Sequence, residues 1–175
     1  MLKHFLFTRR TLVQIVVPLI FGLALLFSAP AQSAVQVRTY GEIQNYCFGE
    51  AAQRYRVSEL LLMAISMTES EFNTSATNFN SNGSKDIGHM QINSIHLPEL
   101  EKYGITEEKL YSNPCLNTNI GAWILSKAIA MFGYTWKAVG VYNTGPNGSR
   151  AQQEIYAGRV KRNLLALLAR ERNGK

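Results

Sequence analysis

The chain has 175 residues and a formal net charge of +6, a length that suits one ordinary domain and is too short for two comfortable ones. This modest positive charge, without any recognisable nucleic-acid motif, argues against a nucleic-acid-binding protein. The three histidines are scattered along the chain, so we predict no metal site, and no cofactor is expected.

The beginning of the chain has the layout of a secretory signal peptide. Basic residues up to Arg10 precede an almost wholly apolar stretch over residues 11–27, and the small residues of "SAPAQSA" follow. This order predicts a cleavable signal peptide over residues 1–34 and a single exported domain over residues 35–175, located in the periplasm. The alternative is an inner-membrane anchor at residues 11–27, whose length just reaches the lower limit for a membrane span.

Removal of residues 1–34 would take away three basic residues and no acidic one, leaving a mildly basic domain of net charge +3. Such a charge favours an anionic partner without identifying one. The remaining cysteines are Cys47 and Cys115, and an even number in an exported chain predicts one disulfide. In the chain-entropy model, a disulfide that closes the loop between Cys47 and Cys115 would stabilise the folded chain by roughly 4 kcal/mol. Two buried free thiols are the alternative.

Helical patterns dominate the domain. Ser58 is a good N-cap, and Glu59 follows it in the first turn of a helix that should end near Ser70. Strand signals are few and short, so the expected fold class is α+β, mostly α. The other expected elements are a loop over residues 73–86, a short extended piece over 87–93, and helices over 42–55, near 95–103 and 106–111, and over 117–132, 135–142 and 150–172.

Two glutamates, Glu69 and Glu71, lie near the end of the expected helix 58–70. At 100° per residue, Glu69 falls on the same side as Leu62 and Ile65, whereas Glu71 would point about 200° away from Glu69. Apolar neighbours and the negative end of the helix dipole should both raise the pKa of Glu69. A carboxyl group that stays protonated near neutral pH suits a general acid. The alternative is a structural Glu69 that bonds a loop amide or a cation, and Glu71 is expected to be a solvated surface residue.

Three sequence motifs follow one another along the chain. They are "ES" at Glu69-Ser70, "GHMQIN" over 88–93 and "AVGVYNTG" over 138–145. In this order and spacing they resemble the lytic transglycosylases with the lysozyme-like fold. The resemblance covers about residues 43–160 and is greatest to the small exported members that accompany type III and type IV secretion, conjugation and pilus systems. It implies a lysozyme-like fold with a glycan-binding cleft.

The resemblance also implies roles for individual residues. Glu69 matches the single catalytic acid of the family, and Cys47 and Cys115 match a disulfide of the small exported members. The residues that match the substrate-binding positions are Ser70, Gly88, Met90, Gln91, Tyr142 and Asn143. His89 departs from the family pattern, in which leucine or isoleucine is usual. We expect His89 to lie at the surface, and tuning of a sugar subsite is the alternative.

Glycoside hydrolysis normally uses two carboxyl groups, and this chain makes the second one hard to supply. Its only aspartate is Asp86, and Glu71 should point away from Glu69. The resemblance implies that Glu69 acts alone in a lytic cleavage of peptidoglycan, between N-acetylmuramic acid and N-acetylglucosamine, that forms a 1,6-anhydro sugar. Asp86 keeps a hydrolytic, lysozyme-type muramidase open as the alternative.

Peptidoglycan glycan strands are therefore the expected partner, with components of a secretion, pilus or conjugation apparatus as further candidates and a monomer as the expected state. Among the aromatic residues, we expect only Tyr142 to stack on a sugar ring. A non-enzymatic scaffold that binds the cell wall is the rival from another class, because the final helix is basic. The simpler interpretation of that helix is an amphipathic element packed by its leucines, with its basic face in water.

Overall fold

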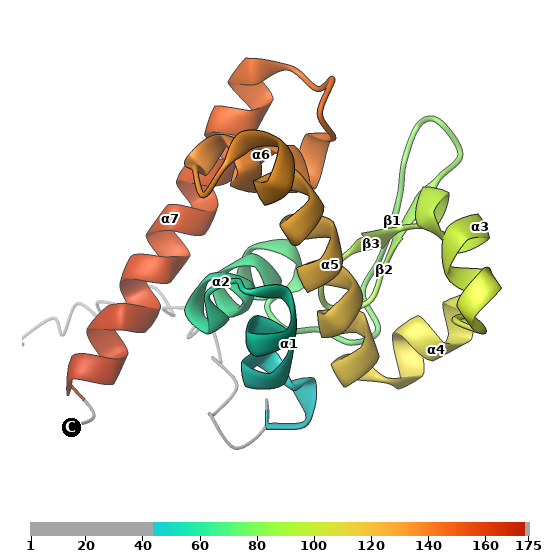
Figure 1. Ribbon diagram of the computed structural model, residues 1–175, viewed down its shortest axis with the longest axis horizontal. Helices are drawn as coiled ribbons and strands as arrows, with labels where there is room; N and C mark the ends of the chain where they lie inside the picture. Colours follow the sequence, from blue (N-terminus) through green and yellow to red (C-terminus); the bar gives the residue numbers. More distant parts are fainter. Residues whose placement is uncertain (1–43, 174–175) are drawn as a thin grey trace, which may run out of the picture. The chain divides into compact units, whose positions relative to one another are not determined.

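The computed structural model describes residues 44–173, which form a mostly helical domain with one small sheet (Figure 1). The expected signal peptide and the alternative anchor at residues 11–27 lie outside the described residues. Within this part of the chain, no helix has both the length and the hydropathy that crossing a membrane requires. The elements are η1 (Gln44–Tyr46), α1 (Phe48–Tyr55), α2 (Glu59–Ser70), β1 (Thr77–Phe79), β2 (Lys85–Ile87), β3 (Ile92–Asn93), η2 (Ser94–His96), α3 (Leu97–Leu100), η3 (Glu101–Tyr103), α4 (Glu107–Ser112), α5 (Pro114–Phe132), α6 (Trp136–Thr144) and α7 (Arg150–Asn173).

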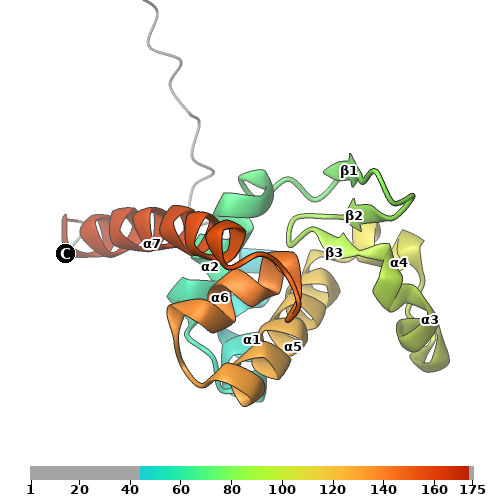
Figure 2. The same cartoon turned by 90° about the horizontal axis from the view of Figure 1, so that it is seen from above.

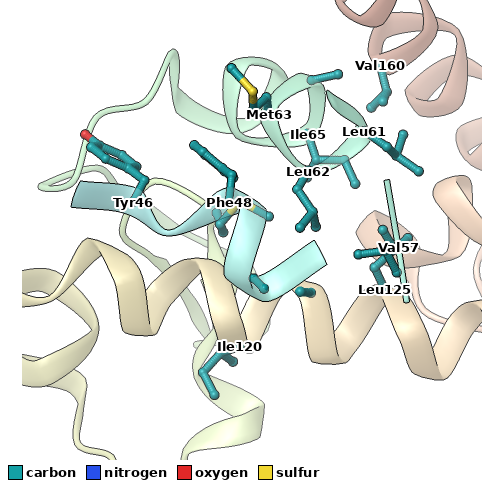
Figure 3. Packing of buried hydrophobic residues seen from close by; sticks show 14 of the residues in the cluster. Tyr46, Phe48, Val57, Leu61, Leu62, Met63, Ile65, Ile120, Leu125 and Val160 are labelled. Atoms are coloured by element: carbon teal, nitrogen blue, oxygen red, sulfur yellow. The ribbon is translucent and has the colours of Figure 1, made fainter. Parts of the chain in front are cut away.

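Helix α2 is the buried centre of the domain. The Ser58 hydroxyl accepts a hydrogen bond from the amide of Leu61, 3.3 Å away, which caps the helix as expected. Every residue from Leu61 to Ser66 is buried, because α1, α5 and α7 each pack against α2. Figure 3 shows the side chains of α2 between α1, α5 and Val160 of α7. A helix that is apolar on all sides is stable only with such neighbours.

The end of α2 is fixed by two non-glycine residues in the left-handed region. Glu71 has φ 53° and Phe72 has φ 63°, a conformation that costs free energy and persists only where surrounding contacts hold it. The Phe72 side chain is buried in the core, and the hydroxyl of Tyr46 donates a 2.7 Å hydrogen bond to its carbonyl oxygen. The chain therefore turns away directly after Glu69 and Ser70, and Glu69 lies in the last turn of α2.

The expected loop over residues 73–86 was wrong in part, because it contains a β-hairpin. Strands β1 and β2 are antiparallel, with Asn78 opposite Asp86, and β2 pairs with β3, with Asp86 opposite Asn93. The three residues of β1 are all exposed. The apolar alternation that predicts a strand is therefore absent from this segment.

The expected helix over 42–55 was also wrong in part, because it is interrupted at Cys47. This residue takes a left-handed conformation, with φ 55°, between η1 and α1. Cys47 and Cys115 form a disulfide, their Cα atoms 4.9 Å apart, which joins the start of α1 to the first turn of α5. Glu50 lies beside both sulfur atoms, but a disulfide offers no thiolate to a metal ion.

Helices α5, α6 and α7 complete the helical wall of the domain. Helix α5 begins at Pro114, three residues before the expected start, because the side chain of Asn113 caps it by accepting from the Leu116 amide at 2.9 Å. Helix α7 packs along α6 and α2. It has a buried apolar face that includes Tyr156 and Val160, as expected of an amphipathic helix. The expectation that its leucines do the packing was wrong in part, because Leu167 is buried and Leu165 and Leu168 are exposed.

Candidate active site

A polar cleft of about 480 Å³ lies where the end of α2 meets the sheet and the end of α6. In Figure 2 the strands lie on one side of α2 and α7 lies on the other. The lining residues come from α2, the β1–β2 hairpin, the turn before β3, β3, η2, α5 and α6. They are Glu69, Asn78, Asn80, Ser81, Asn82, Ser84, Asp86, Gln91, Asn93, His96, Ile124, Tyr142 and Asn143. Most of them carry amides or hydroxyls, which can bind the hydroxyl and acetamido groups of sugars.

Glu69 is the partly buried acid of this cleft. The hydroxyl of Tyr156 donates a 2.5 Å hydrogen bond to its Oε1 atom. Burial raises the pKa of Glu69 to about 7, the hydrogen bond from Tyr156 opposes this rise, and the charge of Asp86 adds to it. Glu69 is therefore a protonated acid at or below neutral pH and can also exist as a carboxylate, as an acid–base catalyst requires.

Two tyrosines lie beside Glu69, and of these Tyr142 lines the cleft. The rings of Tyr142 and Tyr156 are nearly parallel, with centroids 6.5 Å apart and an angle of 17° between their planes. The hydroxyl of Tyr142 donates to the carbonyl oxygen of Met90 at 2.8 Å. Burial raises the pKa of both phenols well above the ordinary value, so both remain hydrogen-bond donors over the whole working pH range.

Tyr156 is the contact of Glu69 that the sequence analysis missed. It lies on α7 and is 87 residues away from Glu69 along the chain. The available signal was helical periodicity, because Tyr156 falls on the same face as Val160 and Leu167. That signal predicts burial, and it does not indicate that the hydroxyl would meet a carboxyl group.

Asp86 is the second carboxyl group of the cleft. Its Oδ2 atom accepts hydrogen bonds from the amides of Asn78 at 3.2 Å and Asn80 at 3.1 Å, and its Oδ1 atom accepts from Asn93 at 2.7 Å. Two of these donors lie directly opposite Asp86 in the sheet register. Both oxygens of Asp86 are therefore held in place by side-chain amide donors.

The turn between β2 and β3 holds the floor of the cleft. Gly88 has φ 73°, and a Cβ atom there would lie 2.4 Å from the amide nitrogen of Asn117, so only glycine fits. The buried Asn117 side chain accepts from the amide of Met90 at 2.9 Å and donates to the carbonyl oxygens of Ile87 and Leu110. Asn117 is a second residue that the sequence analysis missed.

His89 does not lie at the surface, and the expectation that it would was wrong. Its side chain is fully buried, with Nδ1 2.8 Å from the Ser66 hydroxyl and Nε2 3.0 Å from the carbonyl oxygen of Pro114. Its ring packs edge-on against Tyr46, with centroids 4.5 Å apart. A polar ring can occupy this core position because both of its nitrogens have hydrogen-bond partners.

The structure separates the expected site residues into two groups. Glu69, Gln91, Tyr142 and Asn143 line the cleft. Ser70, Gly88 and Met90 lie beneath it: the Ser70 hydroxyl donates to the carbonyl oxygen of His89 at 2.9 Å, and the Met90 side chain is fully buried. Glu71 is exposed at the helix end, as expected, and does not line the cleft.

A mostly helical domain with a three-stranded sheet, and a polar cleft with a protonatable glutamate, define a glycan-cleaving enzyme of the lysozyme-like fold. The family described as "Transglycosylase SLT domain" matches residues 46–165, which is more than half of the chain. The chain therefore belongs to this family and is a peptidoglycan lytic transglycosylase.

Individual relatives agree with this assignment. The chain is 42% identical over 124 residues to protein IpgF of Shigella flexneri, covering 70% of this chain and 82% of IpgF. It is 38% identical over 131 residues to the invasion protein IagB of Salmonella typhimurium, covering 73% of this chain and 82% of IagB. Among solved structures, the lytic transglycosylase Slt of Pseudomonas aeruginosa, crystallised as an inactive mutant, has the same fold with a TM-score of 0.56. It is 21% identical, and the match covers 72% of this chain and 24% of Slt.

Proposed function

We propose that the enzyme cleaves the β-1,4 bond between N-acetylmuramic acid and N-acetylglucosamine, with Glu69 as its acid and base, and leaves a 1,6-anhydro sugar. The observation that carries this proposal is the setting of Glu69. Its carboxyl group faces the cleft with a pKa of about 7, and one of its oxygens already accepts a hydrogen bond from Tyr156.

The steps follow from that geometry. Oε1 accepts from Tyr156, which leaves the other oxygen to carry the proton. Glu69 gives this proton to the glycosidic oxygen while the bond from C1 breaks, and the substrate's own N-acetyl group assists at C1. The hydroxyl at C6 of the same sugar then attacks C1, and Glu69, now a carboxylate, takes the hydroxyl proton. The enzyme returns to its starting state without consuming water.

Hydrolysis is the second candidate, and one observation favours it. Asp86, the residue that kept hydrolysis open as the alternative, lines the same cleft, and its charge raises the pKa of Glu69. A carboxylate held by three amides would stabilise the positive charge that develops at C1 in either reaction. Asp86 therefore assists both routes, and the products must distinguish them.

The test is mass spectrometry of the fragments released from purified peptidoglycan. Lytic cleavage releases muropeptides that end in anhydro sugars, lighter by one water than the hydrolytic products. Reducing ends without anhydro sugars would contradict the lytic proposal and favour the muramidase. If added free sugars changed the composition of the released fragments, by accepting the cleaved glycan, both the lytic and the hydrolytic mechanism would be contradicted.

We also propose that the enzyme works in the periplasm and opens the wall locally for a secretion, pilus or conjugation apparatus. The expected signal peptide over residues 1–34 and the similarity to a protein named for invasion support this role. Mass determination of the chain recovered from the periplasm tests the first part, because retention of residues 11–27 in the membrane fraction would favour the anchor instead. Loss of assembled apparatus on deletion, restored by wild type and not by Glu69→Gln, tests the second.

A further inference from the structure

A second depression adjoins the cleft, on the face where α6 ends and α7 begins. We name it the side furrow. It has a volume of about 330 Å³, and its lining residues are Asn143, Thr144, Gln152, Ile155, Tyr156 and Arg159. Asn143 lines both the cleft and the side furrow. Tyr156, which lines the furrow, also donates a hydrogen bond to Glu69. A single side chain therefore separates the furrow from the reacting carboxyl group.

Arg159 supplies the only charge in the lining of the side furrow. Its guanidinium group lies 5.6 Å from the centre of the Tyr156 ring. Among the residues that the structure describes, no carboxylate forms an ion pair with it. By contrast, Arg150 on the same helix is paired with Glu154 at 2.8 Å. Arg159 is thus an exposed guanidinium group without an ion-pair partner, next to the Tyr156 ring, and it can donate to a planar anion such as a carboxylate.

The rest of the furrow suits a peptide. Ile155 presents an apolar side chain that is 67% exposed, although it lies close to a buried face of α7. Asn143, Thr144 and Gln152 add amide and hydroxyl groups that can pair with peptide N–H and C=O groups. One cation, one exposed aliphatic group and three neutral polar groups are a poor match for a bare sugar and a good match for a short acidic peptide.

We propose that the side furrow receives the peptide stem of the muramic acid residue held in the cleft, and that Arg159 pairs with a carboxylate of that stem. This inference rests on the proposed function. The stem is attached through the lactyl group at C3 of the sugar whose C1 reacts beside Glu69, so it must leave the cleft close to the reacting carboxyl group. The side furrow is the neighbouring depression that shares Asn143 with the cleft, and its Tyr156 donates a hydrogen bond to Glu69 of the cleft.

The experiment compares two substrates, glycan strands with their stems and the same strands stripped of stems by an amidase, which retain only the lactyl carboxylate. Arg159→Gln should raise KM for the stem-bearing strands roughly threefold to tenfold relative to the stripped strands, while any change in kcat is the same for both substrates. Arg159→Lys should restore part of the difference, because charge remains and the planar fork is lost. Arg162→Gln is the matched control, since Arg162 is exposed on the same helix and lies outside the furrow.

The decisive readout is the ratio of kcat/KM for stem-bearing strands to kcat/KM for stripped strands. The charge of Arg159 lowers the pKa of Glu69, so its loss moves the pH profile with both substrates alike and cancels in the ratio. An equal loss on stripped strands would place the lactyl carboxylate on the guanidinium and overturn the stem assignment. No change on either substrate would overturn the site. If wild type cleaves neither substrate, the proposed function fails; binding of a soluble muramyl peptide, weakened or not by Arg159→Gln, then still decides the inference.

Discussion

The two walls of the cleft hold the same chemical group in opposite surroundings. On the helical wall, Glu69 ends a buried helix and receives one hydrogen bond, from a phenol. On the strand wall, Asp86 lies in an exposed hairpin and receives three, from amides. Burial with a single donor raises the pKa of Glu69, whereas amide donors hold both oxygens of Asp86 in place.

This contrast shows how one cleft can keep two carboxyl groups in different roles. The identity of the side chains does not separate their roles, because each carries one carboxyl group. The two carboxyl groups differ in the number of hydrogen-bond donors that they receive, and Glu69 is shielded from water by burial. The charge of Asp86 raises the pKa of Glu69 further. In the proposed mechanism, the proton donor Glu69 and the stabilising charge of Asp86 are therefore electrostatically coupled.

Removal of the protonated group should have the largest effect. We expect Glu69→Gln to reduce glycan cleavage by roughly a thousandfold or more, because the amide can neither donate nor accept the transferred proton. Release of soluble muropeptides measures this loss. The matched control is Glu71→Gln two residues later, which should retain wild-type activity because Glu71 is exposed and does not line the cleft. Equal losses in the two variants would remove Glu69 from the mechanism.

Removal of the charge on the other wall should have the next largest effect. Asp86→Asn should reduce kcat by roughly a hundredfold, because positive charge at C1 loses its stabiliser. The alkaline limit of activity should also fall, since the Asp86 charge raises the pKa of Glu69. A full pH profile measures both effects, with Glu108→Gln on the exposed side of α4 as the control. An unchanged profile would mean that Asp86 only shapes the hairpin.

A smaller loss should follow when the contact between α7 and Glu69 is removed. Tyr156→Phe deletes the hydroxyl that bonds Oε1, and we expect roughly a tenfold lower kcat. Because this hydrogen bond lowers the pKa of Glu69, its loss should move the alkaline limb of the profile to higher pH. Tyr103→Phe, at a side chain that is 77% exposed, should change neither quantity. A shift of the alkaline limb to lower pH would contradict the conclusion that the Tyr156 hydrogen bond lowers the pKa of Glu69.

The smallest effect should appear in stability. The pKa of Glu69 rises from an unfolded value of 4.5 to about 7 on folding, so the folded chain holds the proton more tightly and loses stability as pH increases between these values. After allowance for partial exposure, Glu69→Gln should be about 1–2 kcal/mol more stable than wild type at pH 8 and nearly equal at pH 4. Urea unfolding at the two pH values measures the difference, and a gain at pH 4 alone would refute the linkage.

The helical wall was largely predictable from sequence. The position of Glu69 follows from the Ser58 cap and from the spacing of Leu62 and Ile65, because helical geometry converts sequence spacing directly into direction. The exposure of Glu71 followed for the same reason. The buried partner Tyr156 could not be predicted, because it depends on how α7 packs on α2.

The strand wall was less predictable. The hairpin carries no apolar alternation, and Asp86 meets Asn78 and Asn93 only through the strand register. His89 was wrongly expected at the surface, because its burial depends on Ser66 of α2 and Pro114 of α5, which are distant in sequence. Side chains whose partners are distant in sequence leave no local pattern, and polar residues in this position look like surface residues.

The way α2 ends has a consequence for how such enzymes can change over time. The number of residues between Ser58 and Glu71 fixes the direction in which the Glu69 side chain points. One inserted residue would rotate Glu69 by about 100° around the helix axis and move it about 1.5 Å along that axis. The left-handed pair at Glu71 and Phe72 prevents the helix from absorbing the shift. We therefore expect homologous sequences to vary here by substitution only, and to gain or lose residues at the hairpin tip around Gly83, which is exposed and where an added Cβ meets nothing within 4 Å.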